Sequence, residues 1–113
     1  MLKKENRISK NKDFDRIFKT GQSFYGRILA IKAVKNDLDL NRLGLMVSTK
    51  VSKKAVVRNR FKRQLREIVK KELPQIKPSH DLVIIVFPQI LDKNFQEIEE
   101  LVKNGLKKLK MYK

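Results

Sequence analysis

The sequence predicts a single α+β domain in which helices pack against a central sheet. Its 113 residues are the usual length of one domain. Apolar residues recur at helical spacing in three stretches, and apolar runs typical of strands lie between them. No internal repeat, linker or low-complexity block divides the chain. We therefore expect residues 1–113 to form one unit with the order helix, two or three strands, helix, strand, helix.

The first predicted element is a short amphipathic helix. Asn11 or Asp13 can supply the side-chain oxygen that caps its first turn, and Gly21 suits its C-terminal end. Its apolar positions follow i, i+3, i+4 spacing and are Phe14, Ile17 and Phe18.

Two strands are predicted next. Residues 28–34 and residues 43–48 are mostly apolar and include β-branched side chains, a composition that predicts a strand in each segment. The polar segment at 36–41 predicts a turn between them, so we expect these strands to form a hairpin. Residues 23–27 add a short third strand.

Residues 54–73 form the longest predicted helix, and its two sides differ in chemistry. Pro74 and Pro78 end it and mark a loop. The apolar side consists of Val57, Phe61, Leu65, Ile68 and Val69. The rest of the circumference carries Arg58, Asn59, Arg60, Lys62, Arg63, Arg66 and Lys70.

The last strand and helix follow. Residues 82–87 are apolar without alternation, which is typical of a strand covered on both faces and perhaps parallel to its neighbour. Asp92 or Asn94 can cap the final helix, which has acidic residues early and lysines late, as the helix dipole favours. Its buried stripe is predicted to be Ile98, Leu101, Val102, Leu106 and Leu109.

Positive charge is concentrated around the long helix. The chain has 28 Lys and Arg residues against 12 Asp and Glu residues, a net charge of +16. Residues 50–71 hold ten of these basic side chains and one acidic side chain, Glu67. An exposed pair between Glu67 and Arg63 contributes only about 0.3–0.5 kcal/mol. A solvated basic face is the alternative, but it does not need this asymmetry, so the charge favours RNA or DNA as a partner.

The composition excludes several other functions. The chain has no cysteine and one histidine, His80, which excludes disulfides, zinc fingers, thiol chemistry and a multi-histidine metal site. No apolar run approaches the ~18 residues of a membrane span, and the first seven residues lack the apolar core of a secretory signal. We expect a cytoplasmic protein without a membrane partner. His80 suits a surface loop, and Asp37 and Asp39 suit a turn, so we assign no catalytic or metal-binding residue.

The densest cationic segment, residues 53–67, contains the sequence Arg58-Asn59-Arg60. A guanidinium group binds phosphate through two parallel hydrogen bonds and stays charged at any working pH. A helix fixes the spacing of such groups, and its N-terminal amides can also face a phosphate.

On these residues the chain resembles the protein subunit of bacterial ribonuclease P. The Arg-Asn-Arg motif of that family is matched by Arg58-Asn59-Arg60 within residues 55–67, and in this context the motif is highly specific. The resemblance covers nearly the whole chain. Its other matching segments are residues 6–8, 12–21, 42–48 and 81–86, followed by the amphipathic C-terminal helix.

The resemblance implies an accessory subunit of an endoribonuclease. Ribonuclease P removes the 5′ leader of precursor tRNA by hydrolysing one phosphodiester bond, and in bacteria its RNA subunit is the catalyst. That RNA holds the metal ions, expected to be Mg²⁺, so no cofactor is expected on the protein. The protein of that family binds the catalytic RNA and the single-stranded leader, and it improves the binding of substrate and metal. The implied partners are the catalytic RNA and precursor tRNA, with no DNA partner.

The resemblance also implies which residues bind RNA. The leader is expected to contact Phe14, Phe18, Lys32 and Ser48, because aromatic rings and cations bind any single-stranded sequence. Of the two phenylalanines, we expect one to stack on a base and the other to be buried. Many relatives carry an aromatic residue where Lys32 stands. The residues expected to contact the catalytic RNA are Lys53, Lys54, Arg58, Asn59, Arg60, Lys62, Arg63 and Arg66.

The implied fold is an α-β-β-β-α-β-α sandwich with a mixed sheet, resembling a ribosomal-protein domain. The family has an unusual left-handed crossover between parallel strands around the long helix, whereas about 98% of such crossovers are right-handed. We follow the resemblance here.

Three other functions compete with this hypothesis. A ribosomal protein or RNA chaperone fits the size and charge, but it typically has longer basic tails than this chain. A DNA-binding regulator usually dimerises over two half-sites, and no second interface is evident. A protein-only nuclease needs clustered acids or histidines, which the sequence lacks.

Overall fold

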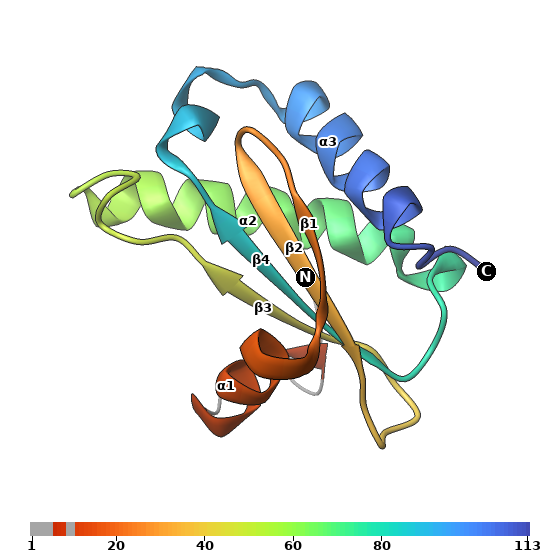
Figure 1. The fold of residues 1–113 in the computed structure, drawn as a ribbon. Coiled ribbons are helices and arrows are strands. Elements are labelled where there is room, and N and C mark those ends of the chain that lie inside the picture. Colours follow the sequence, from red (N-terminus) through yellow and green to blue (C-terminus); the bar gives the residue numbers. More distant parts are fainter. Residues whose placement is uncertain (1–5, 9–10) are drawn as a thin grey trace.

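The computed structural model describes residues 6–8 and 11–113, apart from the side chains of Asn11 and Asp13. The predicted capping of the first helix by either side chain therefore lies outside the described residues. Figure 1 shows the elements. In chain order they are α1 (Asn11–Thr20), β1 (Gln22–Tyr25), β2 (Leu29–Lys35), β3 (Arg42–Met46), α2 (Ala55–Glu72), the 3-10 helix η2 (Leu73–Gln75), β4 (His80–Val86), the 3-10 helix η3 (Pro88–Asp92) and α3 (Phe95–Lys108).

The four strands form one mixed sheet in the order β1-β2-β4-β3. β2 pairs antiparallel with both β1 and β4, and β3 pairs parallel with β4. α2 and α3 pack on one face of the sheet and α1 packs on the other (Figure 1). The predicted α+β fold with a mixed sheet is confirmed. The handedness of the β3–α2–β4 crossover and the likeness to a ribosomal-protein domain stay predictions.

The predicted hairpin between residues 28–34 and 43–48 is wrong. β4 lies between β2 and β3 and pairs with both of them. The turn at 36–41 does reverse the chain, but it leaves a gap one strand wide between β2 and β3. β4 enters this gap after the chain has passed through α2. β4 is apolar on both faces, so the central position removes both faces from water. The hairpin of this sheet is β1–β2, which uses the short strand predicted at 23–27.

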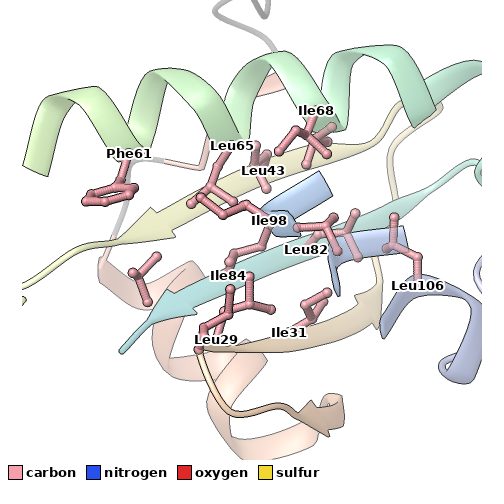
Figure 2. Close-up of a cluster of buried hydrophobic side chains, with 14 of the residues drawn as sticks. Leu29, Ile31, Leu43, Phe61, Leu65, Ile68, Leu82, Ile84, Ile98 and Leu106 are labelled. Atoms are coloured by element: carbon pink, nitrogen blue, oxygen red, sulfur yellow. The ribbon is translucent and has the colours of Figure 1, made fainter. Parts of the chain in front are cut away.

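The main core lies between the sheet and the helices α2 and α3 (Figure 2). α2 contributes Phe61, Leu65, Ile68 and Val69, each no more than 2% exposed, while Val57 is half-buried at the start of the helix. These are the five side chains predicted for the apolar side. Their burial fixes the rotation of α2 about its axis, so its cationic side faces outward.

Of the two predicted caps of α3, Asn94 and not Asp92 caps the helix. The side chain of Asn94 accepts a hydrogen bond from the backbone N–H of Glu97 at 2.9 Å, and the side chain of Glu97 accepts one from the N–H of Asn94 at 3.2 Å. This reciprocal capping satisfies two amides at the start of the helix. Leu101 of the predicted stripe is half-buried. The buried members are Ile98, Val102, Leu106 and Leu109.

On the opposite face, α1 covers only part of the sheet. Ile17 is fully buried there in a small cluster with Ile8 and Val83. Phe14 packs directly over Gly44, where a Cβ atom would lie 2.7 Å from the ring. Only glycine at that position lets α1 approach β3 so closely. Further along the same face, Met46 is 39% exposed, so that part of the sheet is open.

A buried carboxylate connects α1 to the sheet. Asp81, at the start of β4, is fully buried. Its two oxygens accept hydrogen bonds from Arg42 Nε at 2.8 Å and Arg42 Nη2 at 2.7 Å, from Asn36 Nδ2 at 2.8 Å, and from Arg16 Nη2. These donors come from α1, β3 and the turn after β2. Burial alone would raise the pKa of Asp81, but the hydrogen bonds from Arg42 and Asn36 and the charges of both arginines outweigh it and lower the pKa below 3.8.

We predict that Asp81→Asn lowers the free energy of unfolding at pH 7 by about 3–5 kcal/mol, because it leaves two guanidinium groups without their carboxylate. A folded-state pKa below the unfolded one stabilises the fold at pH values above the unfolded pKa. That contribution is lost as the pH falls through the folded pKa. The difference between wild type and variant should therefore shrink below about pH 4. Urea unfolding at several pH values measures it.

Asp37→Asn, in the exposed turn after β2, is the matched control and should change stability by less than about 0.5 kcal/mol. Equal effects of the two substitutions at pH 7 would contradict the role assigned to Asp81.

Candidate nucleic-acid interface

The outward side of α2 is rich in cations, and we call it the α2 surface. Every residue predicted there is exposed or half-buried in the structure, so all of them can reach a ligand. Lys53 and Lys54 are exposed just before the helix begins. The members on the helix are Arg58, Asn59, Arg60, Lys62, Arg63 and Arg66.

The start of α2 adds to this positive potential. Lys54 is the N-cap residue, its side chain makes no capping hydrogen bond, and the first turn contains no acidic residue. The first amides of the helix therefore carry a partial positive charge that no side chain of the helix offsets. Phosphate groups bind well at such a helix end.

The two arginines of the Arg-Asn-Arg motif differ in their surroundings. Arg58 is half-buried, and its Nη1 donates a hydrogen bond to the backbone oxygen of Ser52 at 2.8 Å. It therefore also fixes the loop that leads into α2. Arg60 is exposed, and its guanidinium lies 5.1 Å from the centre of the Phe61 ring. Arg60 is the better probe of ligand binding because it forms no such bond to the loop.

Further along α2, basic groups crowd together. Arg7, Lys62 and Arg66 line a cavity of about 110 Å³ beside the edge strand β3. Burial and the nearby charge of Arg7 lower the pKa of Arg66. A second cavity, of about 270 Å³, is lined by Arg66 together with Asn59, Arg63 and Glu67. An anion bound here would relieve the repulsion between these cations.

Lys32 marks a second candidate surface, on the open part of the sheet beside α1. Its Nζ donates a hydrogen bond to Ser23 Oγ at 2.9 Å and lies 3.4 Å from Tyr25 Oη. The same nitrogen lies 5.8 Å from the centre of the Phe18 ring and 5.6 Å from that of Tyr25. We call Phe18, Ser23, Tyr25 and Lys32 the Lys32 surface.

The structure separates the four residues predicted for the leader. Phe18 is 36% exposed and joins Lys32, whereas Phe14 packs over Gly44 in the small cluster. Ser48 is exposed beyond the end of β3. β4 separates that strand from β2, which carries Lys32, so the structure does not bring Ser48 into the same group.

Two members of the Lys32 surface were missed in the sequence. Tyr25 and Ser23 lie in β1, whose strand was predicted but whose side chains were given no role. The register pairs Ser23 with Lys32, and Tyr25 is 68% exposed two residues further on. Strand alternation places the two on one face, but only the register shows that this face carries Lys32.

The described part of the chain offers few groups for other chemistry. No three His, Cys, Asp or Glu side chains within it are close enough together to hold a metal ion. Within the same residues, no helix is long and apolar enough to cross a membrane.

The fold and the two surfaces define a small basic α+β domain suited to binding RNA. The sequence profile of the Ribonuclease P family matches residues 2–110, so the chain belongs to the ribonuclease P protein family. It is 40% identical over 110 residues to the ribonuclease P protein component of Clostridium botulinum, covering 96% of this chain and 98% of that protein. It is 38% identical to that of a Pseudanabaena species, covering 98% and 97%.

Solved structures are also similar over most of the chain. The RNase P protein of Staphylococcus aureus matches with a TM-score of 0.88 and 34% identity, covering 96% of this chain and 98% of that one. The RNase P protein of Thermotoga maritima matches with a TM-score of 0.81 and 32% identity, covering 90% and 96%. The fold of the family is therefore present.

The Lys32 surface can be tested through its tyrosine. Hydrogen bonding with Ser23 and Lys32, and the charge of Lys32, lower the pKa of Tyr25 below 10.0. Tyr112, the other tyrosine of the chain, donates a hydrogen bond to Glu72 at 2.6 Å. Its burial, together with this hydrogen bond and the charge of Glu72, raises its pKa well above 10.0.

We predict two separate phenol ionisations in an absorbance titration. Lys32→Ala should raise the first toward 10.0 and leave the second unchanged; a single transition in the wild type would contradict this geometry.

Proposed function

We propose that the chain serves ribonuclease P as an RNA-binding subunit, with the α2 surface against the catalytic RNA and the Lys32 surface against the 5′ leader of precursor tRNA. A ribonuclease P protein component is a subunit of the ribonucleoprotein that processes precursor tRNA. The finer assignment of surfaces is our proposal. A ribosomal protein or RNA chaperone is not favoured, because the matches to ribonuclease P proteins extend over nearly the whole chain.

The observation that carries the first assignment is the cationic side of α2. Its charges stand on a helix anchored by Phe61, Leu65 and Ile68, so their spacing is fixed before RNA binds. Prior ordering lowers the entropy cost of binding. Structured RNA presents phosphates at regular spacing, which suits a fixed array better than a flexible basic tail.

The second assignment rests on the chemistry of the Lys32 surface. Phe18 and Tyr25 offer exposed rings for base stacking, and Lys32 between them offers a charge for the backbone. Stacking with neighbouring cations binds single strands with little preference for sequence. The cluster is small, which suits a short part of a leader better than a folded RNA.

We propose that hydrolysis and its metal ions, expected to be Mg²⁺, belong to the RNA subunit. The described carboxylates do not fit a metal site. Asp81 is enclosed by arginines, Glu72 accepts a hydrogen bond from Tyr112, and Glu97 caps α3. We therefore assign the chain no catalytic residue and no step in bond cleavage.

For the α2 surface, we predict that Arg60→Ala weakens assembly with the catalytic RNA. The slope of log K against log salt should fall by roughly one unit for each phosphate that the variant no longer neutralises. Filter binding at several salt concentrations measures both quantities. Arg58→Ala should weaken assembly as well and should also lower the melting temperature, because Arg58 holds the loop at Ser52.

Lys103→Ala, an exposed change of equal charge on α3, is the control and should leave the salt slope unchanged. If Arg60→Ala and Arg58→Ala both bound the catalytic RNA as tightly as the wild type does, the assigned role of the α2 surface would be ruled out.

For the Lys32 surface, we predict that Lys32→Ala leaves assembly intact and reduces the preference for leader-bearing over mature tRNA by about 5–30-fold, the effect of removing one or two stacking or charge interactions. Competition binding to the assembled holoenzyme with the two tRNAs measures this. Equal decreases in affinity for both tRNAs would argue against a leader site at Lys32.

A further inference from the structure

A third basic feature, which shares no residue with either surface, is a cavity of about 390 Å³. Its walls come from the end of α1, the start of β1, the end of β2 and the segment after α3. The segment after α3 runs beside the C-terminal end of α2 (Figure 1). Arg58 and Arg60 lie near the N-terminal end of that helix. The charged or titratable residues lining the cavity are Lys35, Lys77, His80 and Lys110, and no carboxylate lines it.

No acidic partner of the cavity's lysines lies among the residues that the structure describes. Within the described residues, none of the ammonium groups of Lys35, Lys77 and Lys110 forms an ion pair. Three like charges around one hollow repel each other, and a concave wall of low polarisability strengthens their combined field. An anion in the cavity would remove this repulsion.

The backbone of Lys110 has an unusual conformation. Lys110 has φ 57°, in the left-handed region that favours glycine. The N–H of Lys110 bonds the oxygen of Lys107 at 3.0 Å, and the N–H of Met111 bonds that of Leu106 at 2.9 Å. This hydrogen-bond pattern normally ends a helix with glycine, so the lysine here costs conformational energy.

His80 lines the same cavity. Its Nδ1 lies 2.9 Å from the backbone oxygen of Pro78, which can only accept, so Nδ1 carries a hydrogen. The residue before His80, Ser79, also has a positive φ, of 66°, and its oxygen accepts from the N–H of Asn36 at 2.8 Å. The histidine is therefore held in place from its backbone.

The walls are fixed by the C-terminal segment. The N–H of Lys77 donates to the oxygen of Met111 at 2.8 Å, and the N–H of Lys113 donates to that of Gln75 at 2.9 Å. Ile76 and Tyr112 pair between these bonds. The cavity and the backbone positions of Lys77 and Lys110 are thus fixed before any ligand binds. The volume of the cavity lies in the range of small-molecule sites.

We propose that this cavity binds a phosphate group, with Lys35, Lys77 and Lys110 as its cationic contacts and His80 as a neighbouring ring in the wall. The phosphate can belong to an RNA backbone or to a free phosphoanion, since both present the same oxygens. The proposal goes beyond the proposed function, because it uses no residue of the α2 surface or the Lys32 surface.

The lone histidine of the chain makes a direct test possible. In the full chain labelled with ¹⁵N-histidine, all side-chain histidine signals come from His80. We expect pyrophosphate to shift these signals in a saturable way at constant pH and ionic strength. A short single-stranded RNA that shifts the same signals would identify an RNA backbone as the source. A response to pyrophosphate alone would identify a free phosphoanion.

Variants separate binding from folding. Lys110→Gly removes a cation and relieves the positive φ, so it should keep or raise the melting temperature while weakening pyrophosphate binding about tenfold. The double variant Lys35→Gln/Lys77→Gln should weaken it further. Lys103→Gln, an exposed lysine on α3 outside the cavity, is the matched control and should bind as the wild type does. Histidine signals that do not respond to either probe, or equal affinities of Lys110→Gly and the control, would overturn the proposal.

Discussion

The buried carboxylate of Asp81 is the interaction on which the arrangement of α1 against the sheet depends. It joins α1 through Arg16, β3 through Arg42 and the turn after β2 through Asn36. Four donor groups around one fully buried acid satisfy it well enough to keep its pKa low despite burial. α1 is thereby held on one part of the sheet, and the rest of that face, with Lys32, stays open.

A second constraint is the separation of positive charge from the core. A net charge of +16 disfavours a compact chain through self-repulsion. α2 meets this constraint by burying Phe61, Leu65 and Ile68 while its cations project into solvent. Bound phosphates would stabilise the folded chain further, because any ligand that binds only the folded state shifts the equilibrium toward it. Folding and RNA binding therefore favour the same charge distribution.

The sequence predicts the helices and the cationic side of α2 well, because each rests on contacts within one helix. Strand order was not predicted correctly, since nothing in the turn at 36–41 reveals that β4 is later inserted. The difference between Phe14 and Phe18 depends on Gly44, which is distant in the sequence. The Lys32 surface could not be predicted without the β1–β2 register, which places Ser23 opposite Lys32. The burial of Asp81 and the positive φ of Lys110 also do not follow from the local sequence pattern.

The measurement that tests the central claim most directly is leader removal from a precursor tRNA at low magnesium. Three samples are compared: a bacterial catalytic RNA alone, this protein alone, and both together. We predict cleavage in the mixture, with the protein alone inert, because we assign its described residues to RNA binding and none of them to hydrolysis. Cleavage by the protein alone, or no enhancement of several catalytic RNAs, would contradict the account.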